Sequence, residues 1–119
     1  MRKILIVDDE EIICDLMADS FRSRGYDVMT ASSGDEASRI SLDNDFDLVI
    51  SDVRMEKGDG LELAEILLKR DPQYPPVVFV TGYLDTQANV PSNVKKIFKK
   101  PMRFNEIASF ADELFKEAA

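Results

Sequence analysis

The sequence predicts an α/β domain in which helices cover a parallel β-sheet. Two observations support this prediction. Short apolar runs, most of them rich in β-branched residues, alternate with stretches of helical periodicity, as in consecutive βαβ units. Several of these runs also end at polar residues, and the carboxyl ends of parallel strands share one edge of the sheet, where open α/β sheets build their sites. With 119 residues, the chain is long enough for one domain with its own core.

The first half of the chain is expected to form three strands and two helices. In order, these are a strand over 3–7, a helix over 11–24, a strand over 26–31, a helix over 33–41 and a strand over 46–51. Gly25 marks the end of the first helix, and Ser33 with Glu36 forms a capping box for the second. The first helix is expected to direct five apolar side chains toward the core: Ile12, Ile13, Leu16, Met17 and Phe21.

The second half is expected to form a helix over 61–70, strands over 77–81 and 94–99, and a last helix over 103–117. The inward-facing residues of these helices are predicted to be Leu63, Ile66 and Leu67, then Phe104, Ile107, Phe110, Ala111 and Leu114. A helix is also due after the strand over 77–81. Residues 82–93 offer little helical pattern, and Pro91 blocks its continuation, so we expect a short or irregular helix there.

The amino-acid composition argues against several classes of function. No apolar run approaches the roughly 20 residues of a membrane helix, and the N-terminal run stops at Asp8, too early for a signal peptide. Cys14 is the single cysteine, so we expect a reducing, cytoplasmic location and treat Cys14 as a buried hydrophobe. A sequence without histidine excludes imidazole as metal ligand or general base. The net charge of −8 argues against a nucleic-acid-binding surface.

Polar residues at the ends of the predicted strands point to phosphoryl transfer. They are Asp8, Asp9, Asp52, Thr81 and Lys100. Three carboxylates held close together repel one another, and a hard divalent cation such as Mg²⁺, or Mn²⁺, relieves that repulsion. A carboxylate beside the metal can act as nucleophile and form an aspartyl phosphate. The Thr81 hydroxyl and the Lys100 amine would then contact the phosphoryl oxygens.

Taken together, four motifs resemble the receiver domain of two-component response regulators, including chemotaxis regulators. They are Ile-Leu-Ile-Val-Asp-Asp-Glu at 4–10, Asp-Val-Arg-Met-Glu-Lys-Gly-Asp-Gly at 52–60, Val-Thr-Gly at 80–82 and Lys-Pro at 100–101. The resemblance covers nearly the whole chain and implies one receiver domain over 1–119. It also implies a flavodoxin-like (βα)₅ three-layer sandwich with a parallel five-stranded sheet in the order 2-1-3-4-5.

The resemblance implies a role for each site residue. Asp52 would accept a phosphoryl group from a phosphohistidine of a sensor kinase or phosphotransfer protein. Asp9 would bind Mg²⁺ directly, Asp8 would bind it through water, and the backbone carbonyl of Arg54 would be a further ligand. The Lys100–Pro101 peptide bond is usually cis in this family. Such a domain is a signalling switch rather than an enzyme, since it catalyses only its own phosphorylation and dephosphorylation and acts through a downstream protein.

Three departures from the family pattern bear on the output. Ile97 stands three residues before Lys100, where the family usually carries a Tyr or Phe that swings inward with the threonine. Phe98 is one position off and should point into the core. Thr81 and Lys100 are also closer together than is usual, and Glu56 replaces a common proline. We therefore expect retained phosphorylation chemistry with an altered readout.

Two positions are expected to modulate the lifetime of the phosphoryl group. Arg54 and Tyr83 lie two residues after Asp52 and Thr81, and side chains there flank the path of attacking water in the family. A guanidinium and a ring at these places predict slow autodephosphorylation.

Other interpretations of the sequence remain open. A Mg²⁺-dependent phosphohydrolase would need a second acid two residues after its nucleophile, and Asp8 with Asp9 and Glu10 fits that spacing imperfectly. A phosphorylation-independent interaction module is favoured by Ile97 and by the short helix expected after the strand over 77–81, and it is opposed by the intact acid set. The basic segment over 95–103 either binds an acidic partner or guards an edge strand. Binding of nucleic acid or membrane by this domain is not expected, whereas homodimer formation and a stand-alone or longer protein are left open.

Overall fold

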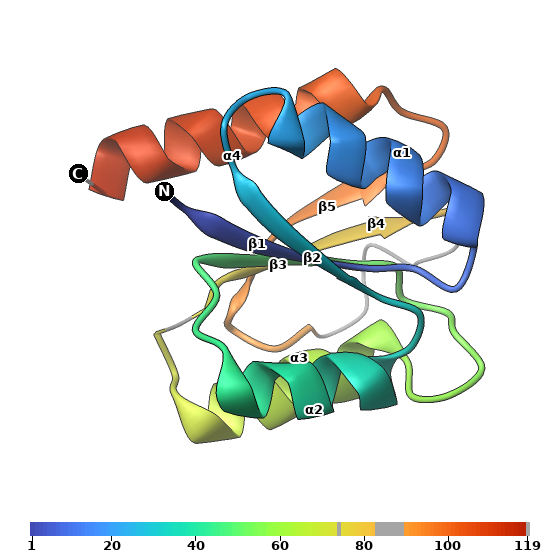
Figure 1. The fold of residues 1–119 in the computed structure, drawn as a ribbon. Coiled ribbons are helices and arrows are strands. Elements are labelled where there is room, and N and C mark those ends of the chain that lie inside the picture. Colours follow the sequence, from blue (N-terminus) through green and yellow to red (C-terminus); the bar gives the residue numbers. More distant parts are fainter. Residues whose placement is uncertain (74, 83–89, 119) are drawn as a thin grey trace.

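The computed structural model describes residues 1–73, 75–82 and 90–118. Within these residues, five parallel strands form one sheet in the order β2-β1-β3-β4-β5, and four helices cover its two faces (Figure 1). This arrangement confirms the predicted three-layer α/β fold and its strand order. No helix in these ranges is long and apolar enough to cross a bilayer.

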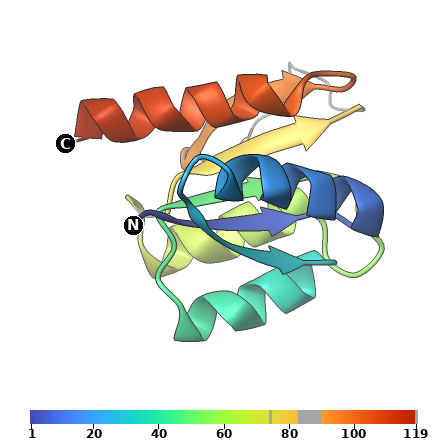
Figure 2. The same cartoon turned by 45° about the horizontal axis from the view of Figure 1, so that its top comes forward.

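The strands differ in burial according to their place in the sheet. Their bounds are β1 Lys3–Val7, β2 Asp27–Ala31, β3 Leu48–Ser51, β4 Val77–Thr81 and β5 Val94–Lys99. The central strands β1, β3 and β4 are almost wholly buried because helices cover both faces, which explains their continuous apolar runs. Figure 2 shows that the strands point in one direction, so their carboxyl ends share one edge of the sheet.

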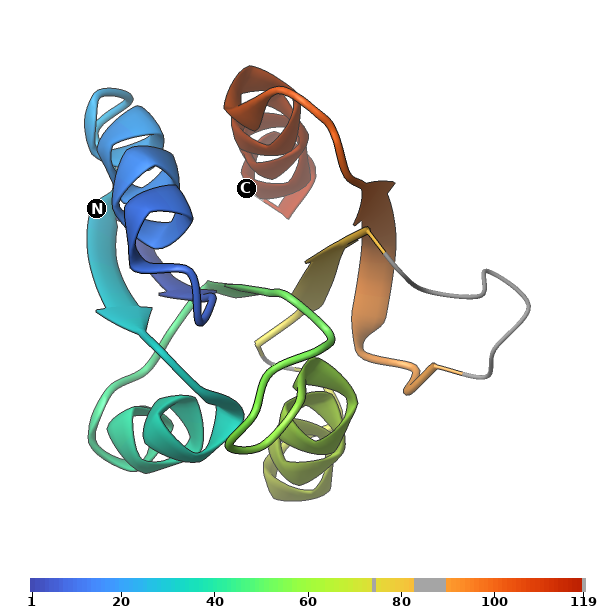
Figure 3. The ribbon, with the colours of Figure 1, turned by 90° about the vertical axis from the view of Figure 1, so that its right-hand side faces the viewer.

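The helices form the two outer layers. Their bounds are α1 Glu11–Arg22, α2 Gly34–Asp43, α3 Gly60–Arg70 and α4 Phe104–Ala118. α1 and α4 cover one face of the sheet, while α2 and α3 cover the other (Figures 1 and 3). Every strand and helix within the described ranges begins and ends within two residues of its predicted bounds.

The predicted capping box of α2 is present with one change of partner. The backbone N–H of Glu36 donates to Ser33 Oγ over 3.1 Å. The Glu36 carboxylate in return accepts from the backbone N–H of Ser32 over 2.8 Å, rather than from that of Ser33. The helix start is therefore fixed by the residues that the sequence indicated.

The prediction of the buried face of α1 was wrong for two residues. Ile12 is 75% exposed and Leu16 is 50% exposed. The helix instead buries its stripe of Cys14, Met17, Ala18 and Phe21. Cys14 is 4% exposed, which confirms its interpretation as a buried hydrophobe.

A smaller correction concerns α3. Ile66, predicted to face inward, is 38% exposed, whereas Leu63 and Leu67 are buried as expected. The inward-facing residues of α4 agree with the prediction: Ile107 and Ala111 are buried, and Phe104, Phe110 and Leu114 pack against the same cluster.

The short or irregular helix predicted between β4 and β5 falls mostly on residues 83–89, which lie outside the described residues. Asn93 closes the connection: its backbone carbonyl accepts from Val77 N–H over 2.8 Å, and its side-chain amide donates to Ala64 O over 2.9 Å. The register then shifts at the start of β5, so Val94 pairs with Val77 and Lys96 pairs with Val78.

The last strand directs neighbouring side chains to opposite faces of the sheet. Ile97 packs against the cluster on the α2 and α3 side. Phe98 packs against the opposite cluster and lies 5.9 Å from Phe110, ring centre to ring centre. Phe98 therefore points into the core as predicted, and the family's aromatic position is occupied by an aliphatic side chain.

Candidate phosphoryl-acceptor and metal site

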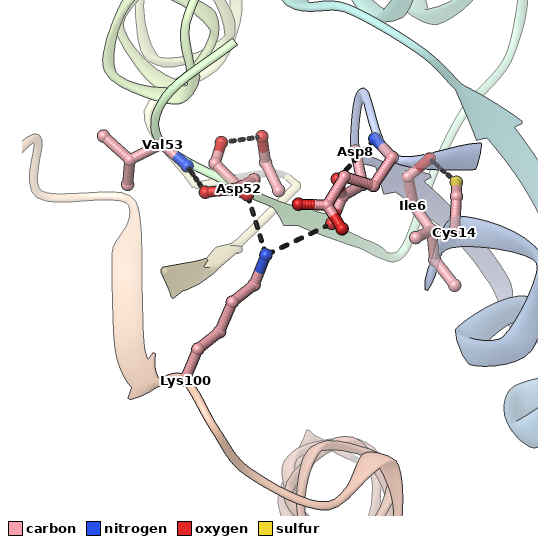
Figure 4. Close-up of polar contacts among 8 residues, drawn as sticks. Ile6, Asp8, Cys14, Asp52, Val53 and Lys100 are labelled. Carbon is pink, nitrogen blue, oxygen red and sulfur yellow. Dashed lines mark hydrogen bonds and ion pairs between the residues drawn. The ribbon is translucent and has the colours of Figure 1, made fainter. Parts of the chain in front are cut away.

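The predicted site residues lie together at the carboxyl edge of the sheet. Asp8 follows β1, Asp52 follows β3, Thr81 ends β4 and Lys100 follows β5. Parallel hydrogen bonding sets this placement, because Asp8 N–H donates to Ala31 O and Asp52 N–H donates to Val7 O, both within 3.1 Å. Figure 4 shows the Lys100 side chain extending toward the carboxylates of Asp8 and Asp52.

Three carboxylates form a compact acidic cluster. One oxygen each from Asp8, Asp9 and Asp52 lies within 4.8 Å of the others. Asp8 is buried, Asp52 is half-buried and Asp9 is exposed, so the cluster opens to solvent on the Asp9 side. These hard oxygen donors fit a divalent cation such as Mg²⁺, whose remaining positions water can fill.

Lys100 neutralises part of this cluster. Its Nζ lies 2.9 Å from Asp52 Oδ2 and 3.6 Å from Asp8 Oδ2. Burial of the amine works to lower its pKa, but the hydrogen bond to Asp52 and the charge of Asp8 outweigh burial, so the Lys100 pKa lies above its ordinary value of 10.5. Lys100 is therefore an ammonium at neutral pH, poised beside the candidate acceptor carboxylate.

The environment of Asp8 disfavours its charge. Burial raises the pKa of this carboxyl above its ordinary value of 3.8. The backbone N–H of Glu10, which donates to Asp8 Oδ1 over 2.9 Å, and the charge of Lys100 act in the opposite direction, but less strongly. Asp52 adds to the rise by like-charge repulsion. A bound cation would remove this disadvantage.

Thr81 and Lys100 are held in register at the end of β4. Thr81 is 2% exposed, and its carbonyl accepts from the Lys100 backbone N–H over 2.9 Å. The following Lys100–Pro101 peptide bond is cis, as the family resemblance implied. Thr81 and Lys100 therefore lie together at the carboxyl ends of the adjacent strands β4 and β5.

The structure places two of the remaining predicted residues, Arg54 and Ile97. Arg54 lines a hollow of about 370 Å³ together with Asp9. Ile97 lies in β5 with its side chain on the α2 and α3 face of the sheet. Tyr83 lies outside the described residues.

Sequence reasoning missed the backbone donors that orient the carboxylates. Val53 N–H donates to Asp52 Oδ1 over 2.7 Å, and Glu10 N–H holds Asp8 Oδ1. A backbone amide has no residue-type signature, so no sequence signal marks these two positions. The sequence predicted no packing role for Gly58 and Gly60 in the loop after Asp52, although the structure packs both tightly against their surroundings.

Comparison with known proteins identifies the family. The model of the response regulator receiver domain matches residues 4–112. The chain therefore belongs to the receiver domain family of two-component response regulators.

Individual relatives agree with this assignment. The transcriptional regulatory protein GlrR of Escherichia coli K12 is 30% identical over 118 residues, which cover 98% of this chain and 27% of that protein. TrrA of Thermotoga maritima, solved in complex with Mg²⁺–BeF, is 29% identical with a TM-score of 0.84, over 96% of this chain and 99% of TrrA.

Two further structures are similar. TrrA in complex with the histidine kinase ThkA matches at 30% identity with a TM-score of 0.83, over 96% of this chain and 98% of that one. A CheY-like receiver domain from Methanospirillum hungatei matches at 27% identity with a TM-score of 0.90, over 98% of this chain and 95% of that one. GlrR is far longer than this chain, so the chain resembles one domain of it.

Proposed function

We propose that Asp52 accepts a phosphoryl group from a phosphohistidine of a sensor histidine kinase or a phosphotransfer protein. The observation that supports this proposal most directly is the 2.9 Å contact between Lys100 Nζ and Asp52 Oδ2 within an acidic cluster. An ammonium beside a cluster of metal-binding carboxylates suits phosphoryl transfer, because the chemistry depends on positioning and charge neutralisation. The similar protein TrrA forms a complex with a histidine kinase.

Asp52, Lys100 and Thr81 have different roles in the proposed phosphoryl transfer. A carboxylate oxygen of Asp52 attacks the phosphorus, the P–N bond to the donor imidazole breaks, and its electron pair stays on that nitrogen, which takes a proton. Lys100 exchanges its contact with the free carboxylate for one with the phosphoryl oxygens, and the Thr81 hydroxyl donates to another of them. Mg²⁺, or Mn²⁺, held by Asp8, Asp9, Asp52 and the Arg54 carbonyl, would supply further charge neutralisation.

The proposal extends to the role of the whole domain. Residues 1–119 form a single receiver domain that acts as a switch, catalysing only its own phosphorylation and dephosphorylation. Its output passes through changed contacts with a downstream protein, or with a second copy of the chain, and not through direct contact with nucleic acid or membrane. The net charge of −8 supports the exclusion of nucleic acid.

A stoichiometric labelling experiment tests this proposal. The protein is incubated with Mg²⁺ and acetyl phosphate, and its intact mass is recorded. We expect one added phosphoryl group, which Asp52→Asn abolishes and which Asp45→Asn, an exposed control outside the acidic cluster, retains. Wild-type protein that neither binds Mg²⁺ nor gains mass would overturn the proposal. Repeated turnover of a small phosphate ester would instead support the phosphohydrolase.

The lifetime of the phosphoryl group forms a second part of the proposal. Arg54 is exposed and lines the hollow beside Asp9, where its guanidinium can shield a phosphorylated carboxylate from water. Tyr83 is proposed for the same role from its place in the sequence. We expect Arg54→Ala and Tyr83→Ala to lose the phosphoryl group faster than wild type, as followed by mass over time. Unchanged decay rates in both variants would contradict the shielding role.

A phosphorylation-independent interaction module is the second candidate function. Ile97, in the position of the family's aromatic switch, favours it because an aliphatic side chain has no ring to rotate. If Asp52→Asn leaves partner binding and signalling unchanged in cells, this second function replaces the first.

A further inference from the structure

The loop that follows Asp52 is fastened to the start of α2 by two backbone hydrogen bonds. Gly34 N–H donates to Gly58 O over 2.9 Å, and Asp35 N–H donates to Lys57 O over 3.1 Å. We call this pair of bonds the α2–loop clasp. Together with the Ser33 cap on Glu36, it provides partners for the first three amide groups of α2, which have none within the helix.

The clasp permits no side chain at either glycine. A Cβ on Gly34 would lie 2.4 Å from Gly58 O, and a Cβ on Gly58 would lie 2.9 Å from Asp35 N. Gly58 also has a φ of +85°, in the left-handed region that favours glycine. The two backbones are therefore in direct contact.

The other end of the loop is fastened to the strand that carries Asp52. Gly60 N–H donates to Val53 O over 2.8 Å, and a Cβ on Gly60 would lie 2.3 Å from Asp52 O. Val53 N–H in turn donates to Asp52 Oδ1. The loop is thus closed on itself at its base, and the clasp fixes its far side against α2.

Arg54 lies between these two anchor points. Arg54 lines the same hollow of about 370 Å³ as Asp9, so a change in the position of the loop would move the Arg54 backbone relative to the acidic cluster. From this geometry we propose that Gly34 and Gly58 are positioning residues, which hold the loop so that the Arg54 carbonyl completes the Mg²⁺ site. This inference rests on the proposed function, because it assigns a role toward the metal of that same site.

The chain offers a matched pair of variants to test the clasp. Gly58→Ala and Gly25→Ala both place alanine at a positive φ, +85° and +91°, but Gly25 has no heavy atom within 4 Å of the added Cβ. Both should lose stability, whereas only Gly58→Ala should weaken Mg²⁺ binding. We expect a loss of about 10- to 100-fold, which is typical when residues that orient metal ligands are removed. Affinity is measured by calorimetric titration of the metal-free protein.

A second variant pair covers the case in which Gly58→Ala does not fold. Gly34→Ala pushes on the clasp from the α2 side, and Ser33→Ala removes the cap of the same helix without touching the loop. We expect weaker Mg²⁺ binding and faster amide hydrogen exchange over residues 54–59 in Gly34→Ala but not in Ser33→Ala. Unchanged affinity in the folded clasp variants, beside a wild type that binds Mg²⁺, would overturn only the clasp. A wild type that does not bind Mg²⁺ would overturn the proposed function, and the role of the clasp with it.

Discussion

Replacing Asp8 by asparagine is expected to stabilise the metal-free protein and to destabilise the Mg²⁺-bound one relative to wild type. At an effective dielectric constant of about 20, attraction to Lys100 at 3.6 Å is worth about 5 kcal/mol, and repulsion from Asp52 within 4.8 Å costs at least about 3.5 kcal/mol. Burying the carboxylate costs several kcal/mol more. The raised pKa of Asp8 shows that the whole balance opposes its charge.

The unfavourable free energy of the Asp8 charge determines how much stability the asparagine variant gains without metal. Because Asp8 is only 3% exposed, an asparagine in its place would escape most of the desolvation cost of a charge at the same volume. We expect about 1–2 kcal/mol of added stability without metal, or a Tm higher by about 4–8 °C for a domain of this size. With Mg²⁺ at 100 times its Kd, wild type gains about 2.7 kcal/mol that the variant lacks. The order of stability should therefore reverse.

The assay is thermal and urea unfolding of both proteins at pH 7.5, in EDTA and in Mg²⁺. The pH dependence in EDTA gives an independent check. A carboxyl whose native pKa is raised binds protons more readily in the folded state, so its contribution to stability falls as pH rises from 3.8 through the native pKa. The advantage of Asp8→Asn should thus be absent below pH 3.8 and grow above it. A variant less stable than wild type in EDTA, or stabilised equally by Mg²⁺, would refute this reasoning.

Three further predictions follow from other contacts. Lys100→Met should bind Mg²⁺ about tenfold more tightly in calorimetric titration, because the competing ammonium is removed from the carboxylates. The same variant should react more slowly with acetyl phosphate, and weaker Mg²⁺ binding than wild type would contradict the prediction. Gly60→Ala should lose at least about 2 kcal/mol in urea unfolding, since its Cβ would lie 2.3 Å from Asp52 O; a wild-type midpoint would show that the loop yields freely. Tyr26→Phe should lose about 1 kcal/mol, because Tyr26 Oη donates to Asp112 Oδ1, and an unchanged urea midpoint would show that water replaces this bond.

The sequence predicted the strands and the meeting of the site residues more accurately than it predicted which side chains of α1 are buried. Consecutive apolar runs ending in polar residues have one arrangement in a parallel sheet, so Asp8, Asp52 and Lys100 met as expected. In α1 the apolar residues cover more of the helix than the sheet can bury. The small residues Cys14 and Ala18 let their side of α1 pack closely against the core, so Ile12, on another side of the helix, is exposed. Periodicity alone cannot rank two overlapping apolar stripes.

The geometry within the site depended on contacts that sequence does not encode by residue type. The N–H groups that orient the carboxylates and the α2–loop clasp are backbone interactions. Only glycine gives a sequence signal of such contacts, as at Gly34 and Gly58, because a close approach of two backbones excludes a Cβ. A glycine thus marks that something lies close by without indicating which segment it is.

The buried thiol of Cys14 provides a natural chemical probe for transient separation of α1 from the sheet. Its Sγ lies 3.7 Å from Ile6 O in the core between α1 and the sheet, and it is the single cysteine of the sequence (Figure 4). Burial raises its pKa to about 11, so little reactive thiolate exists at neutral pH. An alkylating reagent therefore modifies Cys14 when α1 separates from the sheet. The alkylation rate, followed by mass, therefore reports how often α1 separates from the sheet. A lower rate with bound metal or with the phosphoryl group would show that either one suppresses this opening.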